Sequence, residues 1–183
     1  MAPFVALTGT PGTGKTRTSK LLAKGLRRVE VAELAQEARA SRRSGSGWVV
    51  DTEALGAWME LRPPAKTCLV VGHLAHLLPV SRIIVLRCHP VELEHRLNRA
   101  RKGTRSERRA NAVAEAIDYI LVEARSTKKP TWQVDTTHAS PVEVAKRVSQ
   151  VLRTGRQPRS PQVDWLSDPV VTEWLLRGDR YRR

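Results

Sequence analysis

Residues 9–16 read Gly-Thr-Pro-Gly-Thr-Gly-Lys-Thr, and this stretch decides the fold expected for the chain. It satisfies the phosphate-loop pattern Gly-x-x-x-x-Gly-Lys-Ser/Thr at every constrained position. An apolar run at residues 3–7 precedes it, and a helix-like segment at residues 17–26 follows it. The glycines let the backbone turn with positive φ and approach an anion closely, so that successive N–H groups can surround phosphate oxygens. This context favours a nucleotide-binding loop over a glycine-rich turn that binds nothing.

Two side chains of this stretch are expected to contact the nucleotide and its metal ion. Lys15 should reach the β- and γ-phosphates of ATP, and the Thr16 hydroxyl should ligate magnesium. The helix that follows adds free N–H groups and the positive end of its dipole.

Short apolar segments alternate with helix-like segments along the chain. The expected strands are residues 3–8, 29–31, 67–72, 82–88 and the strand with its exit loop at 130–137. The expected helices are residues 17–25, 32–38, 53–61, a helix that begins at Pro90, 107–125 and 142–152. Strands connected through helices predict a parallel sheet that is covered on both faces. The fold class is therefore α/β, a three-layer, doubly wound, parallel five-stranded sheet.

Two basic segments and one histidine are further site candidates. Residues 39–48 are expected to be a flexible basic loop, either a clamp for a second phosphate or a surface turn. The arginine cluster at residues 96–105, interrupted by Gly103, is either a mobile lid over the phosphates or a solvated helix face. His73 follows the third strand at the end where ligands gather in open α/β sheets, whereas His76 is expected to be packed or solvated.

Charge is the unusual feature of the composition. The 183 residues include 32 Lys and Arg against 18 Asp and Glu, a formal net charge of +14. Such a balance favours polyanionic partners such as nucleotides or RNA, or else it is only a well-solvated arginine-rich surface.

Cys68 and Cys88 each lie in an apolar run and form no Cys-x-x-Cys pair. They are therefore expected to be reduced core residues, which fits a cytoplasmic protein. The first apolar stretch runs directly into the phosphate loop, so a secretory leader is not expected. No stretch approaches the roughly 20 apolar residues of a membrane span.

The last part of the chain changes character after Thr154. Residues 155–161 read as a linker, and residues 164–165 and 170–176 form a short apolar patch. This patch is expected either to dock back on the domain or to bind a partner.

The order of the motifs resembles one family. The motifs are the loop at 9–16, Gly-His at 72–73 followed by Leu-Leu-Pro at 77–79, Val-Leu-Arg-Cys-x-Pro at 85–90, Arg-Leu at 96–97, Asn111 with Ala-Glu-Ala at 114–116, and Asp-Thr-Thr at 135–137. Together they are similar to the archaeal adenylate kinase type that is related to the eukaryotic nuclear adenylate kinase, isoenzyme six. The similarity covers about residues 3–152.

The resemblance implies a P-loop nucleoside monophosphate kinase-like domain at residues 1–153, followed by a linker and C-terminal docking tail at residues 154–183. Residues of about 29–52 would form the monophosphate arm, and about 98–109 the lid. The ATP phosphates would be held by Gly12, Thr13, Gly14, Lys15, Thr16 and the backbone of Arg17. Arg101 is the best match to the nucleotide-contacting arginine of the lid, and His73 matches a histidine tied to ATP hydrolysis.

The resemblance also implies what the protein binds. Its substrates would be ATP with magnesium and AMP, and it would transiently bind a ribosomal protein of the small-subunit platform. The basic surface would also suit contact with pre-ribosomal RNA. Two departures from the family are visible: Val71 stands where the family places Asp or Glu, and the lid lacks the family's Arg-Gly-Tyr/Trp run. Magnesium would then rely on Thr16, waters and the nucleotide.

Two functions from different classes follow. The first is an adenylate kinase that transfers the terminal phosphate of ATP to AMP, has ATPase activity and takes part in small-subunit maturation. The second is an ATP-driven ribosome assembly factor with weak or vestigial kinase activity, which Val71 favours. A GTPase-like switch is disfavoured because the sequence has no Asn-Lys-x-Asp motif.

Overall fold

The computed structural model describes residues 3–23, 25–45, 47–101, 103–157 and 163–178. Its centre is a five-stranded parallel sheet in the order β2-β5-β1-β6-β7. The strands are β1 (Phe4–Thr8), β2 (Arg27–Glu30), β5 (Cys68–Val71), β6 (Arg82–Arg87) and β7 (Thr131–Asp135). The predicted α/β class with five parallel strands is confirmed.

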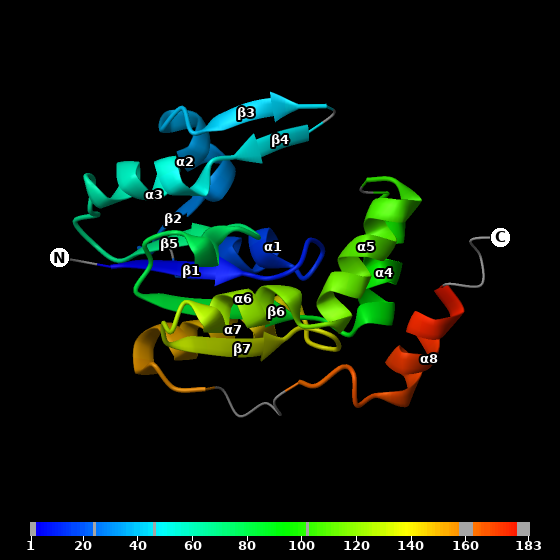
Figure 1. The fold of residues 1–183 in the computed structure, drawn as a ribbon. Coiled ribbons are helices and arrows are strands. Elements are labelled where there is room, and N and C mark those ends of the chain that lie inside the picture. Colours follow the sequence, from blue (N-terminus) through cyan, green and yellow to red (C-terminus); the bar gives the residue numbers. More distant parts are fainter. Residues whose placement is uncertain (1–2, 24, 46, 102, 158–162, 179–183) are drawn as a thin grey trace.

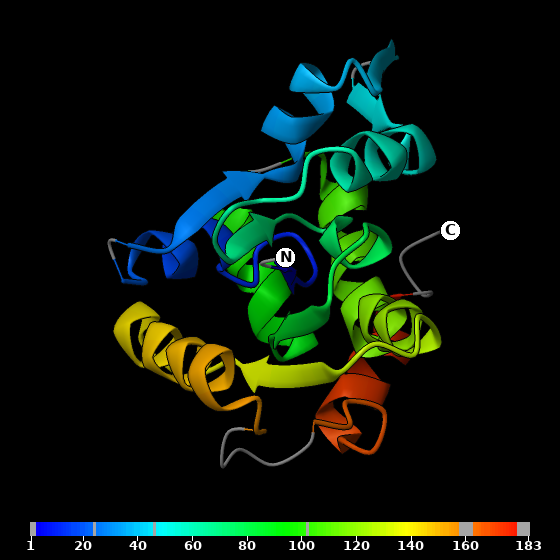
Figure 2. The same cartoon turned by 90° about the vertical axis from the view of Figure 1, so that its left-hand side faces the viewer.

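Side chains of the central strands alternate between two apolar clusters, because successive residues of a strand point to opposite faces. One cluster contains Ala6, Val70 and Ile83 and is covered by α2 (Val31–Glu37), α3 (Thr52–Glu60), the short 3-10 helix η1 (Ala75–Leu77) and α6 (Tyr119–Ser126). The other contains Val5, Leu69 and Ile84 and is covered by α7 (Pro141–Thr154) and by Leu22, which follows α1 (Lys15–Lys20). Figure 2 shows the sheet between these two layers of helices.

Two further units lie outside the central sheet, a β-hairpin and a pair of helices (Figure 1). One is the antiparallel hairpin of β3 (Ser41–Ser44) and β4 (Gly47–Val50), which lies above α2 and α3 in Figure 1. The other is the pair α4 (Pro90–Arg99) and α5 (Arg105–Ala116), which lies past the carboxyl end of β1.

The prediction of a flexible loop over residues 39–48 is wrong. The segment pairs as a hairpin with Arg42 opposite Val49 and Arg43 opposite Trp48. Gly45 supplies the positive φ, +57°, that a tight hairpin turn requires, and Ser46 lies outside the described residues. The serine and arginine content suggested a loop, but the β-branched residues of β4 support pairing.

Two predicted helices also have different bounds. The single helix expected over residues 107–125 is divided into α5 and α6, because Asp118 adopts a left-handed φ of +57° and its carboxylate binds the Arg87 guanidinium. The helix expected over 17–25 ends at Lys20, where the N–H of Leu21 bonds to the carbonyl of Thr18. Its Thr and Ser residues have modest helix propensity, so the segment is short.

The C-terminal segment packs against α4 and α5. Trp165 and Val171 form an apolar cluster with Ala116, and α8 (Pro169–Gly178) lies beside α4 in Figure 1. The Trp174 indole N–H donates to Glu94 Oε2 (2.8 Å), and the Arg109 guanidinium lies 3.4 Å from the centre of the Trp174 ring. Residues 158–161 of the predicted linker lie outside the described residues.

Candidate functional site

Residues 9–16 follow β1 at the carboxyl end of the sheet, as a loop over residues 9–14 and the first two residues of α1. Three of its glycines have a positive φ, and two of these also leave no room for a Cβ atom. Gly9 has a φ of +134°, and a Cβ there would come within 2.3 Å of the Leu86 carbonyl oxygen. Gly12 has a φ of +96°, and a Cβ there would come within 2.8 Å of the Leu93 side chain of α4. The loop is therefore held close to both β6 and α4, in a backbone form that other residues rarely adopt.

The side chain of Lys15 turns back toward the start of the loop. Its ammonium group donates to the carbonyl oxygens of Gly9 (2.6 Å) and Thr10 (3.1 Å). The buried Thr13 hydroxyl donates to the same Thr10 carbonyl (2.9 Å), which stiffens the turn. One positive charge is thus placed at the loop, where backbone N–H groups of a phosphate loop converge on an anion.

Thr16 and Arg17 occupy the first turn of α1, and both side chains are exposed. The Glu30 carboxyl at the end of β2 lies near the Thr16 hydroxyl. Partial burial raises the pKa of Glu30 above its usual value, and the Thr16 hydroxyl opposes this shift by stabilising the carboxylate. This proximity could not be read from the sequence, where Glu30 is only part of a short β-branched strand.

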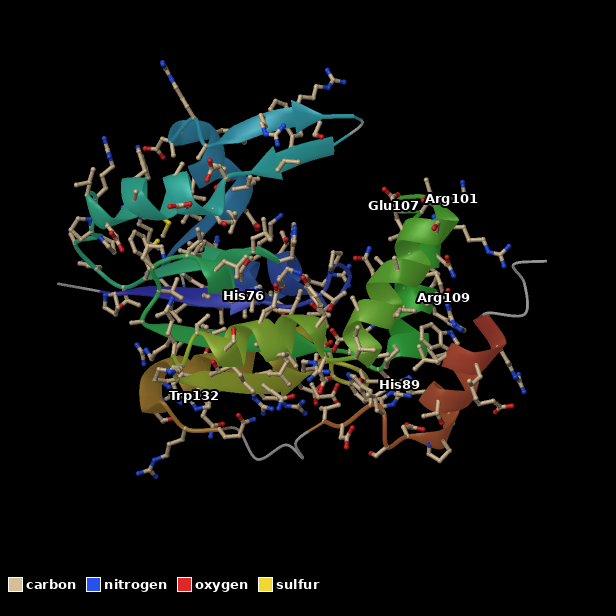
Figure 3. All side chains as sticks on the ribbon, viewed as in Figure 1. His76, His89, Arg101, Glu107, Arg109 and Trp132 are labelled. Atoms are coloured by element: carbon tan, nitrogen blue, oxygen red, sulfur yellow. The ribbon has the colours of Figure 1, made fainter. Side chains whose placement is uncertain are left out.

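His73 follows β5 and its side chain is exposed. Its pKa is lowered from the usual value, first by partial desolvation and then by the nearby Lys15 ammonium and His76. An imidazole in this position is therefore mostly neutral near pH 7 and can accept a proton. His76 is 1% exposed and bonds to Thr8 Oγ1 (3.1 Å) and Glu123 Oε2 (3.2 Å), so of the two expected alternatives it is packed and not solvated (Figure 3).

The arginines of the predicted lid do not gather at the loop. Arg101 has a φ of +49° and lies at the tip of the turn between α4 and α5, away from the sheet (Figure 3). Arg99 bonds to Glu92 Oε1 (3.4 Å), and Arg108 donates to Asn98 Oδ1 (2.7 Å). Arg96 instead bonds to the carbonyls of Thr136 (2.9 Å) and Thr137 (2.6 Å) beyond β7. Lys102, within the predicted lid, lies outside the described residues.

The sequence analysis assigned no role to Glu115, a buried residue whose carboxylate accepts a hydrogen bond from Thr10 of the loop. This carboxylate is 3% exposed and accepts from the Thr10 hydroxyl, Arg87 Nε (2.7 Å), the backbone N–H of Cys88 (3.1 Å) and the Trp165 indole (3.2 Å). The available signal was a glutamate on the apolar face of a helix, between Ala112 and Ala116. A buried carboxylate must be paired, so its position predicts a cationic partner.

The residues present suit magnesium only together with a nucleotide. Across the described ranges, no group of three or more His, Cys, Asp or Glu side chains could hold a metal ion. The Thr16 hydroxyl and the Glu30 carboxylate are oxygen donors of the kind that Mg²⁺ prefers, and this ion usually keeps several waters and binds substrate phosphates. The donor set therefore fits a nucleotide-bound ion.

None of the helices within the described residues is both long enough and apolar enough to cross a membrane.

Comparison with known proteins identifies relatives along nearly the whole chain. Residues 5–118 match the family model described as AAA domain. A protein of Thermococcus onnurineus named "Putative adenylate kinase" is 34% identical over 179 residues, which are 96% of this chain and 99% of that protein. A protein of the same name from Archaeoglobus fulgidus is 36% identical over 171 residues, 90% of this chain and 93% of that protein.

Solved structures show the same architecture. The shikimate kinase of Acinetobacter baumannii aligns with a TM-score of 0.58 and 15% identity, over 86% of this chain and 97% of that one. TT1252 from Thermus thermophilus aligns with a TM-score of 0.53 and 18% identity, over 84% of this chain and 99% of that one. At these identities the likeness concerns the fold alone. With a family model that spans more than half of the chain and with relatives above 30% identity over nearly all of it, this protein belongs to the AAA-domain family of archaeal proteins named "Putative adenylate kinase".

Proposed function

We propose that the protein is a nucleoside monophosphate kinase that transfers the terminal phosphate of ATP to AMP and also hydrolyses ATP. The observation that carries this proposal is the loop after β1, where glycines of positive φ and the ammonium of Lys15 form a phosphate-binding geometry. The relatives named "Putative adenylate kinase" support AMP as the acceptor.

Each part of the site would have a separate task. The ATP phosphates would be held by Gly12, Thr13, Gly14, Lys15 and the backbone of Arg17, and magnesium by the Thr16 hydroxyl. The hairpin arm, residues 29–52, and the lid, residues 98–109, would close over the substrates and exclude water. Arg101 would reach the nucleotide only after such closure, because it lies at the tip of the α4–α5 turn.

The transfer itself needs no protein nucleophile. A phosphate oxygen of AMP attacks the γ-phosphorus in line while the bond to the ADP oxygen breaks. Bound Mg²⁺ would supply charge neutralisation on the β- and γ-phosphates. Lys15 would offset the charge of the transferring group, and neutral His73 would accept a proton from water in the slower hydrolysis.

A second candidate function is an ATP-driven assembly factor for the small ribosomal subunit in the cytoplasm. It would bind a platform ribosomal protein transiently and contact pre-ribosomal RNA, with weak kinase activity. Val71 at the end of β5, in place of an acid, favours this candidate, and the formal net charge of +14 suits a polyanionic partner.

One assay separates the two candidates. Purified protein is given ATP and magnesium with and without AMP, and ADP and free phosphate are both measured. Fast ADP formation that depends on AMP supports the kinase, whereas slow phosphate release that is independent of AMP supports the assembly ATPase. Absence of turnover together with absence of ATP binding would overturn both.

The same assay tests the loop mechanism. Lys15→Ala should lower turnover by on the order of 100-fold or more, because an electrostatic contact to the transferring group is lost. Its fold should persist, as checked by circular dichroism. The matched control is Lys146→Ala, which removes an exposed lysine from α7 and should leave turnover unchanged. Unchanged rates in Lys15→Ala would contradict the mechanism.

A further inference from the structure

We propose that Glu115 is a positioning residue of the phosphate loop, which fixes Thr10 and, through the Thr10 carbonyl, sets the place of the Lys15 ammonium. This inference rests on the proposed function, because Lys15 is there taken to offset the charge of the transferring phosphoryl group. It assigns a role in the reaction to an acid of α5 that the loop motif does not contain.

Thr10 is the residue at which the contacts inside the loop meet. Its side chain is 1% exposed, and its hydroxyl donates to Glu115 Oε2. Its carbonyl oxygen accepts from the Lys15 ammonium (3.1 Å), the Thr13 hydroxyl (2.9 Å) and the Thr13 backbone N–H (3.2 Å). Because the hydroxyl and the carbonyl belong to one residue, the contact with Glu115 limits the rotation of the peptide group that these donors share. Thr10 therefore connects a buried carboxylate to the position of Lys15.

The Glu115 carboxylate is itself held in place through its other oxygen. Oε1 accepts from Arg87 Nε (2.7 Å), the Cys88 backbone N–H (3.1 Å) and the Trp165 indole N–H (3.2 Å). These donors belong to the end of β6 and to the C-terminal segment, so they fix the carboxylate relative to the sheet. Oε2 is thereby directed at Thr10. All of these partners donate, as a carboxylate that only accepts requires, and hydrogen bonds to a charged acceptor are stronger than neutral ones.

A fixed Thr10 keeps the Lys15 ammonium in place before the nucleotide binds. The ammonium donates to the Thr10 carbonyl and to the Gly9 carbonyl (2.6 Å), which are backbone groups at the start of the loop. A charge that is already in position needs no reorganisation during the reaction, and this preorganisation stabilises the transition state. Loosening Thr10 should therefore lower the rate of transfer more than the affinity for ATP, which depends mainly on the backbone N–H groups of the loop.

The competing explanation is that Glu115 serves only as the counter-ion of Arg87. Arg87 also contacts the Asp118 carboxylate and Gln133 Oε1 (2.8 Å), and neither of these contacts involves Thr10. If Glu115 were only a counter-ion, loss of the Thr10 hydroxyl would leave the reaction unchanged. Thr10→Val removes this hydroxyl, keeps a β-branched side chain and leaves the donors to Oε1 intact.

The test compares Thr10→Val with Thr10→Ser, which keeps the hydroxyl, and with the matched control Thr131→Val. The Thr131 hydroxyl donates to the Lys129 carbonyl (2.9 Å) at the amino end of β7, the opposite end of the sheet from the loop. ADP formation from ATP and AMP with magnesium gives kcat and KM, and calorimetry gives the affinity for a non-hydrolysable ATP analogue.

Thr10→Val should lower kcat by at least about 10-fold, toward the roughly 100-fold that a misplacement of about 1 Å can cost. Its affinity for the analogue should stay close to that of the wild type. Thr10→Ser and Thr131→Val should both keep kcat near the wild-type value, because neither loses the hydrogen bond to Glu115.

A second comparison asks whether Thr10 acts through Lys15. Introduced into Lys15→Ala, Thr10→Val should cause no further fall in kcat, because the effects of two residues in one line of contacts are not additive. A purely structural role would instead lower kcat by the same factor in both backgrounds.

Each of four results would overturn the inference: wild-type kcat in Thr10→Val, an equal loss in Thr10→Val and Thr10→Ser, an equal fall in kcat and in analogue affinity, or the full effect of Thr10→Val in Lys15→Ala. If Thr10→Val does not fold, Thr10→Ala removes the same hydroxyl with a smaller side chain and is measured in the same way. Wild-type protein that forms no ADP and binds no nucleotide would instead reject the proposed function, so the two failures are distinguishable.

Discussion

Replacing Glu115 with glutamine removes one charge from a buried cluster of polar residues that includes Thr10 and Arg87. The wild-type carboxylate accepts from the Thr10 hydroxyl, Arg87 Nε, the Cys88 N–H and the Trp165 indole. A glutamine amide can keep most of these hydrogen bonds, since its oxygen can face Arg87 while its NH₂ group faces the hydroxyl. The negative charge beside the Arg87 guanidinium, which is 1% exposed, is lost.

The expected cost is large because it leaves a buried cation incompletely paired. Removing one partner of a buried ion pair costs about 3–5 kcal/mol, whereas an exposed pair contributes about 0–1 kcal/mol. We expect Glu115→Gln to lower the free energy of unfolding by about 3 kcal/mol, the lower end of this range. The reason is that the Asp118 carboxylate and Gln133 Oε1 (2.8 Å) still contact Arg87. The free energy of unfolding of most domains is only about 5–15 kcal/mol, so such a loss is measurable.

Urea unfolding followed by far-ultraviolet circular dichroism measures this loss. Glu92→Gln is the control, because that acid is 33% exposed and pairs with Arg96 (3.1 Å) on the surface of α4. Adding Arg87→Met to Glu115→Gln should recover part of the stability, since no unpaired cation remains in the core. If Glu115→Gln costs no more than Glu92→Gln at an unchanged urea slope, the assignment of Glu115 as the buried counter-ion is refuted.

Two further predictions concern histidines. His73→Ala should impair ATP hydrolysis more than ATP binding if neutral His73 accepts a proton, as proposed above; equal losses in phosphate-release and calorimetric assays would indicate a structural role. Burial lowers the pKa of His76 in the folded protein, whereas His76 of the unfolded chain takes up a proton near its ordinary pKa of 6.5. The contribution of His76 to the free energy of unfolding should therefore be retained above about pH 6.5 and be lost as the pH falls below this value. His76→Gln should flatten this acid-side loss in urea titrations at several pH values, and an unchanged slope would argue against the desolvated imidazole.

The sequence predicted the central layer of the fold because its signals are local. Each buried strand is a short apolar run, and the phosphate loop fixes which strand comes first and where the first helix begins. The hairpin over residues 41–50 was missed because its serines and arginines are typical of loops, whereas cross-strand pairing stabilises it. The break at Asp118 was missed because it depends on Arg87, which is 31 residues away in the chain.

The same distinction holds for the candidate site. The residues of the loop can be assigned from spacing, since one contiguous motif contains them. Glu115 could not be assigned, because its contact with Thr10 arises only when separate segments meet. The roles of His73 and Arg101 remain predictions.

The indole of Trp165 and the hydroxyl of Thr10 share one acceptor, the carboxylate of Glu115. The C-terminal segment is thus two hydrogen bonds away from the phosphate loop, although more than 150 residues lie between Thr10 and Trp165. Cutting the protein after Thr154 would therefore do more than shorten it. It would remove the Trp165 indole, one of the hydrogen-bond donors to Glu115, and would expose the surface of Ala116 to water. A truncated protein should therefore not be treated as equivalent to the intact one.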